Sequence, residues 1–143
     1  MEEKALVYNA KIDVRFAETD AMGIVHHATY PIWFEQARTE FFKTAGASFL
    51  EMEQEGFESP VLELNVQYKQ PCRYGDTVRV ETIMVQEDRI KSRFYYKVFV
   101  GDKLCTTGST THIFTKNGRP TRDRPTNFQK IADAMFSEKP ENF

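Results

Sequence analysis

The sequence contains little cysteine and little net charge, and it has no long apolar run. Its two cysteines, Cys72 and Cys105, are isolated and fit no metal-binding or redox spacing, so we expect free thiols in a reducing compartment. The net charge of −2 argues against a general role in nucleic-acid binding. The first residues are charged and no stretch approaches membrane-spanning length, so we expect neither a signal peptide nor membrane insertion. Together these features predict a cytoplasmic protein.

Several catalytic motifs are also missing. The sequence has no G-x-S-x-G motif, no P-loop, no G-x-G-x-x-G and no H-E-x-x-H. Its three histidines, His26, His27 and His112, are the obvious candidates for metal binding. We expect no metal site, because adjacent side chains usually point apart and no pattern of supporting carboxylates accompanies them.

What the sequence does contain is typical of one globular domain, and we expect that domain to span residues 1–143. A chain of 143 residues with 41% hydrophobic and 28% charged residues can bury a substantial core. Aromatic residues make up 13% of the chain, including twelve phenylalanines. Most of these are expected to pack the core, and some could line a pocket for an apolar ligand.

A helical period over residues 30–45 predicts one long helix. Its apolar face consists of Tyr30, Trp33, Phe34, Ala37, Phe41 and Ala45. We expect Thr29 to cap its N-terminus, Pro31 to occupy its first turn and Gly46 to end it. This face is rich in bulky aromatic residues, so the helix should lie deep in the structure. Ser48, Glu51 and Gly56 predict a second, short helix.

Alternating apolar residues predict a strand before the long helix and four strands after it. The first covers residues 10–16, with Phe16 on its buried face. The others cover residues 62–68, 78–85, 93–100 and 104–115, with a turn at Asn117-Gly118 after the last. Short connections favour antiparallel pairing, so we predict an α+β fold with the helix against one sheet. Residues 126–136 are expected to form a short terminal helix.

The loop between the first strand and the long helix is the best candidate for chemistry. Asp20 lies among Ala21, Met22, Ile24 and Val25, so we expect its carboxylate to be partly shielded from water. The loop leads into a helix N-terminus, whose free N–H groups can hold a developing negative charge. The alternative is a loop aspartate that only caps a turn through its own side chain.

The stretch TDAMGIVHHATYPIWFEQAR resembles the hot-dog-fold acyl-CoA thioesterases of the 4-hydroxybenzoyl-CoA thioesterase type, especially the Tol-Pal-associated subgroup. The shared pattern is T-D-x-x-G-x-V-x-H-x-x-Y followed by F-E-x-A-R, and VQYKQPCRYGDTVRVET resembles the family's second and third strands. The resemblance implies an antiparallel five-stranded sheet wrapped around one long central helix. It also implies a homodimer or homotetramer with the substrate groove between subunits.

By position, the resemblance assigns catalytic roles to Asp20 and His27. Asp20 would act as a general base on water or as a nucleophile. The backbone N–H of His27 would polarise the thioester carbonyl, and its side chain would either lie at the site or serve as a capping or packing residue. Gly23 and Tyr30 fall on the pattern's glycine and tyrosine and are assigned to substrate binding. Acyl specificity stays open, because His26 and Phe16 depart from the residues usual in the family.

The resemblance also implies contacts to the phosphates of coenzyme A. The candidates are Arg89 and Lys91 at one turn, and Arg119, Arg122 and Arg124 after the last strand, although each alone could be a solvated basic residue. Some relatives use a glutamate on the central helix instead of the loop aspartate. Glu35 and Glu40 are the candidates here, and their place on the polar face indicates a structural role.

The function predicted from these residues is hydrolysis of an acyl-CoA to the free acid and CoA. No metal or redox cofactor is expected, since coenzyme A is part of the substrate. Two alternatives remain open: a hot-dog dehydratase acting on hydroxyacyl thioesters, with His27 and Asp20 as base and acid, and a non-catalytic acyl-CoA-binding module. Acyl-chain preference, and CoA versus acyl-carrier protein as the thiol, stay undetermined.

Overall fold

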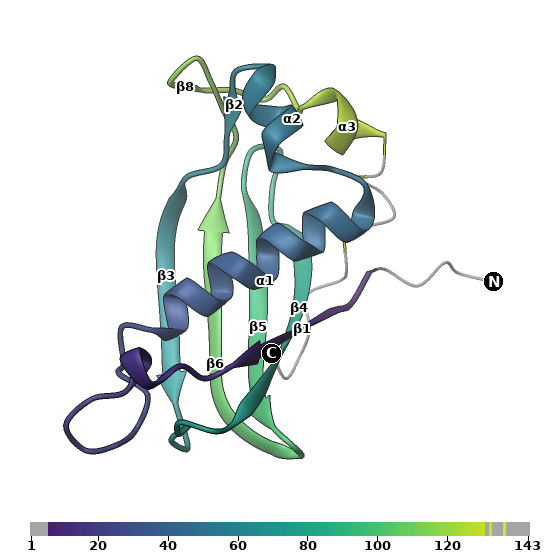
Figure 1. Ribbon diagram of the computed structural model, residues 1–143. Helices are drawn as coiled ribbons and strands as arrows, with labels where there is room; N and C mark the ends of the chain where they lie inside the picture. The colour runs from purple at the N-terminus through teal and green to yellow at the C-terminus, as the bar shows by residue number, and fades with distance from the viewer. Residues whose placement is uncertain (1–5, 131, 133–135, 137–143) are drawn as a thin grey trace.

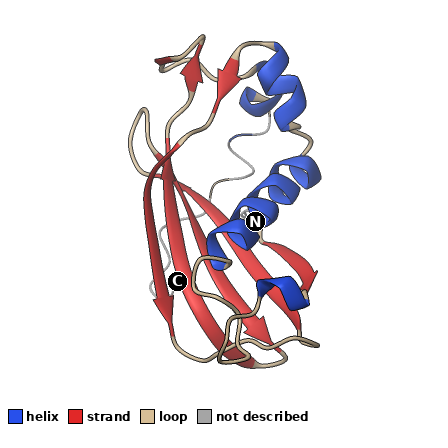
Figure 2. Cartoon of the chain, turned by 60° about the vertical axis from the view of Figure 1, so that its left-hand side comes forward, coloured by secondary structure: helices blue, strands red, loops and turns tan. Residues whose placement is uncertain are grey.

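The computed structural model describes residues 6–130, 132 and 136, and it consists of a twisted sheet with one long helix lying across one face (Figures 1 and 2). The five strands are β1 (Tyr8–Asp13), β3 (Val61–Tyr68), β4 (Thr77–Gln86), β5 (Ser92–Val100) and β6 (Lys103–His112). They pair in the order β1-β4-β5-β6-β3, and every pairing is antiparallel. The predicted α+β fold with a five-stranded antiparallel sheet and a central helix is therefore confirmed.

The long helix α1 (Tyr30–Ala45) has the predicted bounds. Its buried residues are Tyr30, Trp33, Phe34, Ala37, Phe41 and Phe42, whereas Ala45 is only partly buried. Pro31 lies in the first turn, and Gly46 ends the helix in a left-handed conformation with φ of 94°. Thr29 is the N-cap residue, as predicted, but its side chain makes no capping hydrogen bond. Its hydroxyl donates instead to the Glu18 carbonyl at 3.4 Å, so the cap is replaced by a contact back to the preceding loop.

At Gly108 in β6 the helix packs against the sheet with no room for a side chain. A Cβ atom at this position would lie 2.5 Å and 2.6 Å from two ring atoms of Phe34 and 2.8 Å from the Asn65 carbonyl oxygen. On its other face the Phe34 ring stacks on Tyr96, with ring centres 4.2 Å apart and planes 3° from parallel. Glycine is therefore required because the aromatic ring occupies the space of a side chain.

The first strand is shorter than predicted, and Phe16 is not on its buried face. The strand ends at Asp13, and Phe16–Glu18 forms a single 3-10 turn, η1. Phe16 is 75% exposed and contacts Tyr74 edge to face. The alternating pattern continues past the point where the chain turns, because the Glu18 carboxylate accepts a hydrogen bond from the Arg15 N–H and closes the turn.

The predicted strand over residues 104–115 also ends early, at His112. Thr115 belongs to a second, small sheet formed by β2 (Phe57–Glu58), β7 (Thr115–Lys116) and β8 (Arg119–Pro120). The turn at Asn117-Gly118 joins β7 to β8 with positive φ at both residues. This sheet was not predicted, because two-residue strands have no readable alternation.

Two short helices pack at the same end of the molecule as the small sheet (Figure 1). The predicted second helix is α2 (Phe49–Gln54), in which the Ser48 hydroxyl accepts from the Leu50 N–H at 3.2 Å. The predicted terminal helix is confirmed in part as α3 (Thr126–Gln129), and several of its later residues lie outside the described part. None of the described helices has the length and apolar character that crossing a lipid bilayer requires.

Strand β3 lies at one edge of the large sheet and is largely exposed. Its apolar residues include Leu62, Leu64 and Tyr68, which are 51%, 46% and 53% exposed. An edge strand also presents backbone N–H and C=O groups with no neighbouring strand. This edge is therefore both apolar and open to further pairing.

Candidate active site

Asp20 lies in a tight loop that the backbone closes on itself. The Asp20 N–H donates to the Ile24 carbonyl at 2.8 Å, and the Gly23 N–H donates to the Asp20 carbonyl at 3.0 Å. Gly23 has a positive φ of 78°, which a residue with a side chain rarely adopts. The loop is tied to the connection between β3 and β4 by the Val25 N–H, which donates to the Cys72 carbonyl at 2.8 Å. The carboxylate is therefore presented from a fixed turn.

The Asp20 carboxylate has one occupied and one open oxygen. Oδ1 accepts from the Met22 N–H at 2.8 Å, which is the turn-capping contact expected of a loop aspartate. Oδ2 accepts no hydrogen bond from any residue that the structure describes. The residue is half-buried, although Ala21 and Met22, two of the apolar neighbours expected to cover it, are exposed. Capping and chemistry are therefore compatible, since one oxygen is left for each.

Glu18 holds this loop against the start of α1, a role that the sequence did not reveal. Its carboxylate is 7% exposed and accepts from the Trp33 indole N–H at 3.0 Å, and Arg15 lies 3.5 Å from it. Its backbone carbonyl accepts from the His26 N–H at 2.8 Å. Both contacts fix the turn that carries the two histidines.

The backbone N–H of His27 is the open donor in this turn. The N–H groups of Val25, His26 and Thr29 donate to carbonyls at 2.8–2.9 Å, and that of Ala28 donates to His26 Nδ1 at 3.0 Å. That of His27 finds no acceptor within the described part of the chain. A free N–H just before a helix N-terminus is a donor that a substrate oxygen can use.

The imidazoles of His26 and His27 are both exposed and stack on each other, with ring centres 4.1 Å apart. The expectation that the two side chains point apart is therefore wrong. In the described residues no group of three or more metal-binding side chains is close enough to hold a metal ion.

Asp20, His27 and Tyr30 line one pocket of about 330 Å³. Its remaining walls are formed by Met22, Ile24, Val25, Tyr68, Lys69, Gln70 and Pro71. Tyr30 is 2% exposed, and its burial raises the pKa of the phenol above its ordinary value. Gly23 shapes the loop but is not part of the pocket wall. The pocket thus has several apolar wall residues, and the residues that carry the open carboxylate oxygen and the free N–H, Asp20 and His27, both line it.

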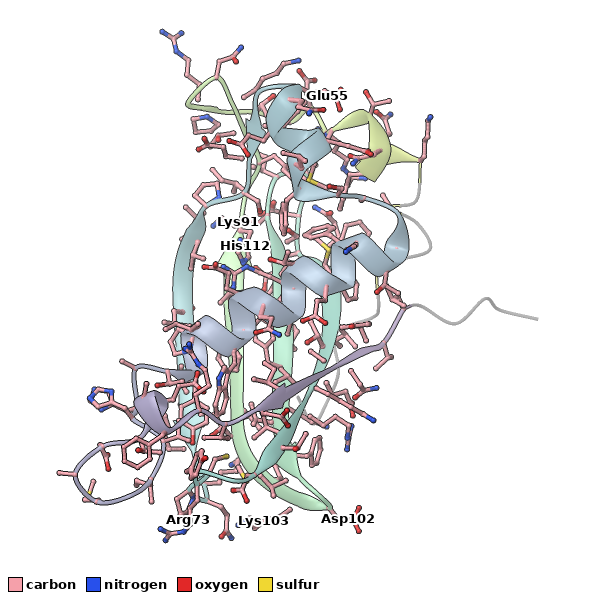
Figure 3. The ribbon with its side chains drawn as sticks, viewed as in Figure 1. Glu55, Arg73, Lys91, Asp102, Lys103 and His112 are labelled. Atoms are coloured by element: carbon pink, nitrogen blue, oxygen red, sulfur yellow. The ribbon has the colours of Figure 1, made fainter. Side chains whose placement is uncertain are left out.

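The basic candidates lie at the opposite end of the sheet. Figure 3 labels Arg73, whose backbone pairs with Ile24 of the Asp20 loop, at one end, and Glu55, which lines the basic pocket, at the other. This second pocket has a volume of about 720 Å³, and Arg89, Lys116, Arg122 and Arg124 contribute its positive charge. Lys91 and Arg119 do not line it. One predicted group thus contributes Arg89 and the other contributes Arg122 and Arg124 to a pocket that Lys116, Glu55 and Asp123 also line.

The helix glutamates are engaged elsewhere. Glu35 is 73% exposed and lies 3.9 Å from Arg38, while Glu40 accepts from the Tyr8 hydroxyl at 2.9 Å. Neither residue lines the Asp20 pocket. These contacts agree with the structural role expected for both.

The third histidine, His112, is buried beneath the helix in a hydrogen-bond network. Its Nε2 lies 2.8 Å from the Thr110 hydroxyl, and its Nδ1 lies 3.1 Å from the Ser59 carbonyl. Burial, with the positive charge of Arg38, lowers the pKa of His112 to about 4. The imidazole is therefore neutral in the folded protein at pH values where an unfolded histidine is protonated.

This shift predicts that acid destabilises the fold through His112. Between pH 6.5 and about 4 the unfolded chain binds a proton that the folded chain excludes, so stability falls as pH falls through this window. We expect about 2 kcal/mol to be lost between pH 7 and pH 5. Urea unfolding at both pH values should show this loss in the wild type and a smaller one in His112→Gln. His26→Gln, which changes an exposed histidine, should behave like the wild type, and an undiminished loss in His112→Gln would contradict the assignment.

Comparison with known proteins finds the same family by sequence and by structure. The profile of the Thioesterase-like superfamily matches residues 14–135. YneP of Bacillus subtilis (strain 168), proposed as an acyl-CoA thioesterase, is 38% identical over 108 residues, which cover 75% of this chain and 78% of that protein. The acyl-CoA thioester hydrolase YbgC of Escherichia coli O6:H1 is 32% identical over 71 residues, which cover 50% of this chain and 53% of that protein.

Among solved structures, a DHNA-CoA thioesterase from Staphylococcus aureus superposes with a TM-score of 0.79. It is 36% identical, and the match covers 89% of this chain and 85% of that chain. The fold and the sequence therefore point to the same set of relatives.

Proposed function

This chain belongs to the Thioesterase-like superfamily, and on that premise we propose that it hydrolyses an acyl-CoA thioester to the free acid and CoA. Homologues and structural neighbours are named acyl-CoA thioesterases or thioester hydrolases. The observation that supports the proposal best is the pocket lined by Asp20 and His27, which carry a carboxylate oxygen and a backbone N–H without partners among the described residues. Hydrolysis of a thioester needs both kinds of group.

In the proposed reaction the carbonyl oxygen of the thioester accepts from the His27 N–H. As a general base, Asp20 would take a proton from water while the water oxygen attacks the carbonyl carbon. The C–S bond then breaks, CoA leaves as the thiolate, and the thiolate is protonated. As a nucleophile, Asp20 would attack the carbonyl itself, expel the thiolate and form an anhydride that water hydrolyses. Both routes use Oδ2, the oxygen that does not cap the turn.

Finer assignments belong to the same proposal. The T-D-x-x-G-x-V-x-H-x-x-Y pattern supports membership in the Tol-Pal-associated subgroup, in which the His27 side chain would lie near the reacting thioester. The exposed imidazole is free to contact the substrate. Tyr30 would contribute its ring to the pocket wall, and Gly23 would act through the shape of the loop. No metal or redox cofactor takes part in either route.

We propose that the working unit is at least a dimer formed by β3. Pairing of two copies of this edge in an antiparallel manner about a two-fold axis would bury Leu62 and Leu64. Antiparallel pairing reverses the partner's direction, so the partner's basic pocket would lie beside the Asp20 pocket. This arrangement explains how groups at opposite ends of one chain could bind the two ends of one acyl-CoA. Further pairing of dimers would give the tetramer.

Removal of charge from the basic pocket should weaken substrate binding and spare the chemical step. We expect Arg89→Gln/Arg122→Gln to raise KM about tenfold or more, since each lost contact to a phosphate is worth roughly 1.5–3 kcal/mol before solvent screening, with kcat nearly unchanged. Lys11→Gln/Lys103→Gln removes the same charge from exposed positions outside both pockets and should leave KM unchanged. Steady-state kinetics over a salt series measures both effects, and equal KM values in the two double variants would contradict the assignment.

Mixed dimers test whether the two pockets of one site come from different subunits. One subunit carries Asp20→Asn and the other carries Arg89→Gln/Arg122→Gln, with different tags so that the mixed dimer can be purified. If each active site is shared between subunits, one of the two sites in the mixed dimer combines the intact Asp20 of one subunit with the intact basic pocket of the other. We expect activity at low substrate above that of either parent dimer. Activity no higher than the mean of the parents would mean that each subunit uses its own pockets.

A panel of aryl and alkyl acyl-CoAs, assayed for release of free thiol, tests the proposed function. Hydrolysis of at least one member with release of equal amounts of acid and thiol supports it. Conversion of a hydroxyacyl-CoA to an enoyl-CoA without thiol release would show that the protein is a dehydratase. Saturable binding with neither product would show a binding module.

A further inference from the structure

Tyr68 connects the edge strand to the turn that carries the free N–H. It is the last residue of β3, and its hydroxyl donates to the backbone carbonyl of His27 at 2.7 Å, a contact between residues 41 positions apart. Its ring lies edge to face against Tyr30, with ring centres 5.4 Å apart. Both aromatic rings line the Asp20 pocket. Tyr68 therefore lines the pocket and also binds the backbone of the turn that contains His27.

Among the described residues, the Tyr68 hydroxyl is the one hydrogen-bond partner of His27 itself. The His27 side chain is exposed and contacts the His26 ring, which is exposed as well. On the N-terminal side of His27, residue His26 is held by contacts within the loop that precedes α1. Its N–H donates to the Glu18 carbonyl, and its carbonyl accepts from the Thr29 N–H. On the C-terminal side the Tyr68 hydroxyl holds the carbonyl of His27 itself. The N–H of His27 lies in the peptide plane that it shares with the His26 carbonyl, and the His27 carbonyl lies in the next plane. The Tyr68 contact holds this second plane and so restrains how the two planes are turned about the Cα atom of His27.

We propose that Tyr68 is a positioning residue that holds the His27 N–H toward the substrate carbonyl. Its role rests on the proposed function, because the oriented donor matters only if a carbonyl oxygen binds there. Tyr68 does not touch the reacting atoms through its hydroxyl, which is already engaged with His27. The donor is therefore aligned before the substrate arrives, which is the condition under which such a contact lowers a barrier most.

Tyr68→Phe removes this hydroxyl and keeps the ring. We expect kcat to fall about tenfold, the size of one ordinary hydrogen bond, while KM stays within about twofold because the pocket wall is intact. Tyr8→Phe is the matched control. It also deletes a phenol hydroxyl that binds a distant residue, Glu40 of α1, at 2.9 Å, but it lies outside the pocket. It should leave both constants unchanged.

A second measurement does not depend on turnover. The ¹⁵N order parameter of His27 should be near the rigid value of about 0.85 in the wild type and in Tyr8→Phe, and clearly lower in Tyr68→Phe. An unchanged order parameter together with unchanged kcat would overturn the proposal. If the wild type releases no thiol from any acyl-CoA, the proposed function fails, and the order parameter alone still decides whether Tyr68 positions the donor. A fall in kcat shared by Tyr8→Phe would indicate a general structural effect and would also overturn it.

Discussion

Asp20→Asn should lower kcat by about 10²–10⁴-fold while KM and thermal stability stay close to those of the wild type. Asparagine keeps an oxygen that can accept from the Met22 N–H, so the turn should remain closed. It cannot accept a proton from water and it is a poor nucleophile. The loss therefore isolates the chemical role of the carboxylate from its capping role. Asp20→Ala would remove both, and it is the less informative variant.

Asp76→Asn is the matched control for this result. Asp76 is also half-buried and also accepts from a backbone N–H, that of Arg73, at 2.8 Å, but it does not line the Asp20 pocket. Thiol release with the best acyl-CoA, measured with both variants and the wild type, should show the loss in Asp20→Asn alone. A kcat for Asp20→Asn within tenfold of the wild type would remove Asp20 from the mechanism.

Gly108→Ala should destabilise the fold by about 3 kcal/mol, which for a chain of this size lowers Tm by roughly 10 °C. The added methyl group would lie 2.5 Å from the Phe34 ring, and that ring cannot retreat because it stacks on Tyr96. Relief would require the helix to move away from the sheet, and α1 begins at the candidate site. We therefore expect a loss of activity that exceeds the loss of folded protein.

A double-mutant cycle with Phe34→Leu tests the cause of that destabilisation. The shorter side chain removes the ring atoms that the methyl group would meet, although the contact with the Asn65 carbonyl remains. Gly108→Ala should therefore cost less in the Phe34→Leu background than in the wild type, as thermal unfolding would measure. An equal cost in both backgrounds would show that the ring is not the obstacle.

The parts of the fold that were predicted correctly are those with local signals. The bounds of α1 follow from a helical period, a proline in the first turn and Gly46 after the last turn, all within a short stretch. The predictions failed where the direction of the chain is set by contacts with residues outside the local pattern. Phe16 continues an alternating pattern, but the Glu18 carboxylate turns the chain before it. The small sheet pairs β2 with β7, two strands far apart in the sequence, at the end of the molecule where α2 lies.

The residues of the candidate site were likewise predicted where the signal is local and missed where their partners lie far away in the sequence. Asp20 and His27 were predicted from the resemblance of one continuous stretch, and the structure brings both to one pocket. Glu18 and Tyr68 were missed, because their roles depend on partners 15 and 41 residues away. Nothing in the sequence distinguishes this glutamate or tyrosine from others. Arg89 and Lys91 were assigned together by the same resemblance, and Arg89 lines the basic pocket whereas Lys91 and Arg119 do not.

A crystal structure with a ketone analogue of an acyl-CoA, in which a methylene group replaces the thioester sulfur, tests the account most directly. The analogue keeps the carbonyl and cannot be hydrolysed. We expect its carbonyl oxygen to lie about 3 Å from the His27 nitrogen, with an Asp20 oxygen within about 3.5 Å of the carbonyl carbon or of a water beside it. A carbonyl bound outside the pocket of Asp20, or turned away from the His27 N–H, would contradict the account.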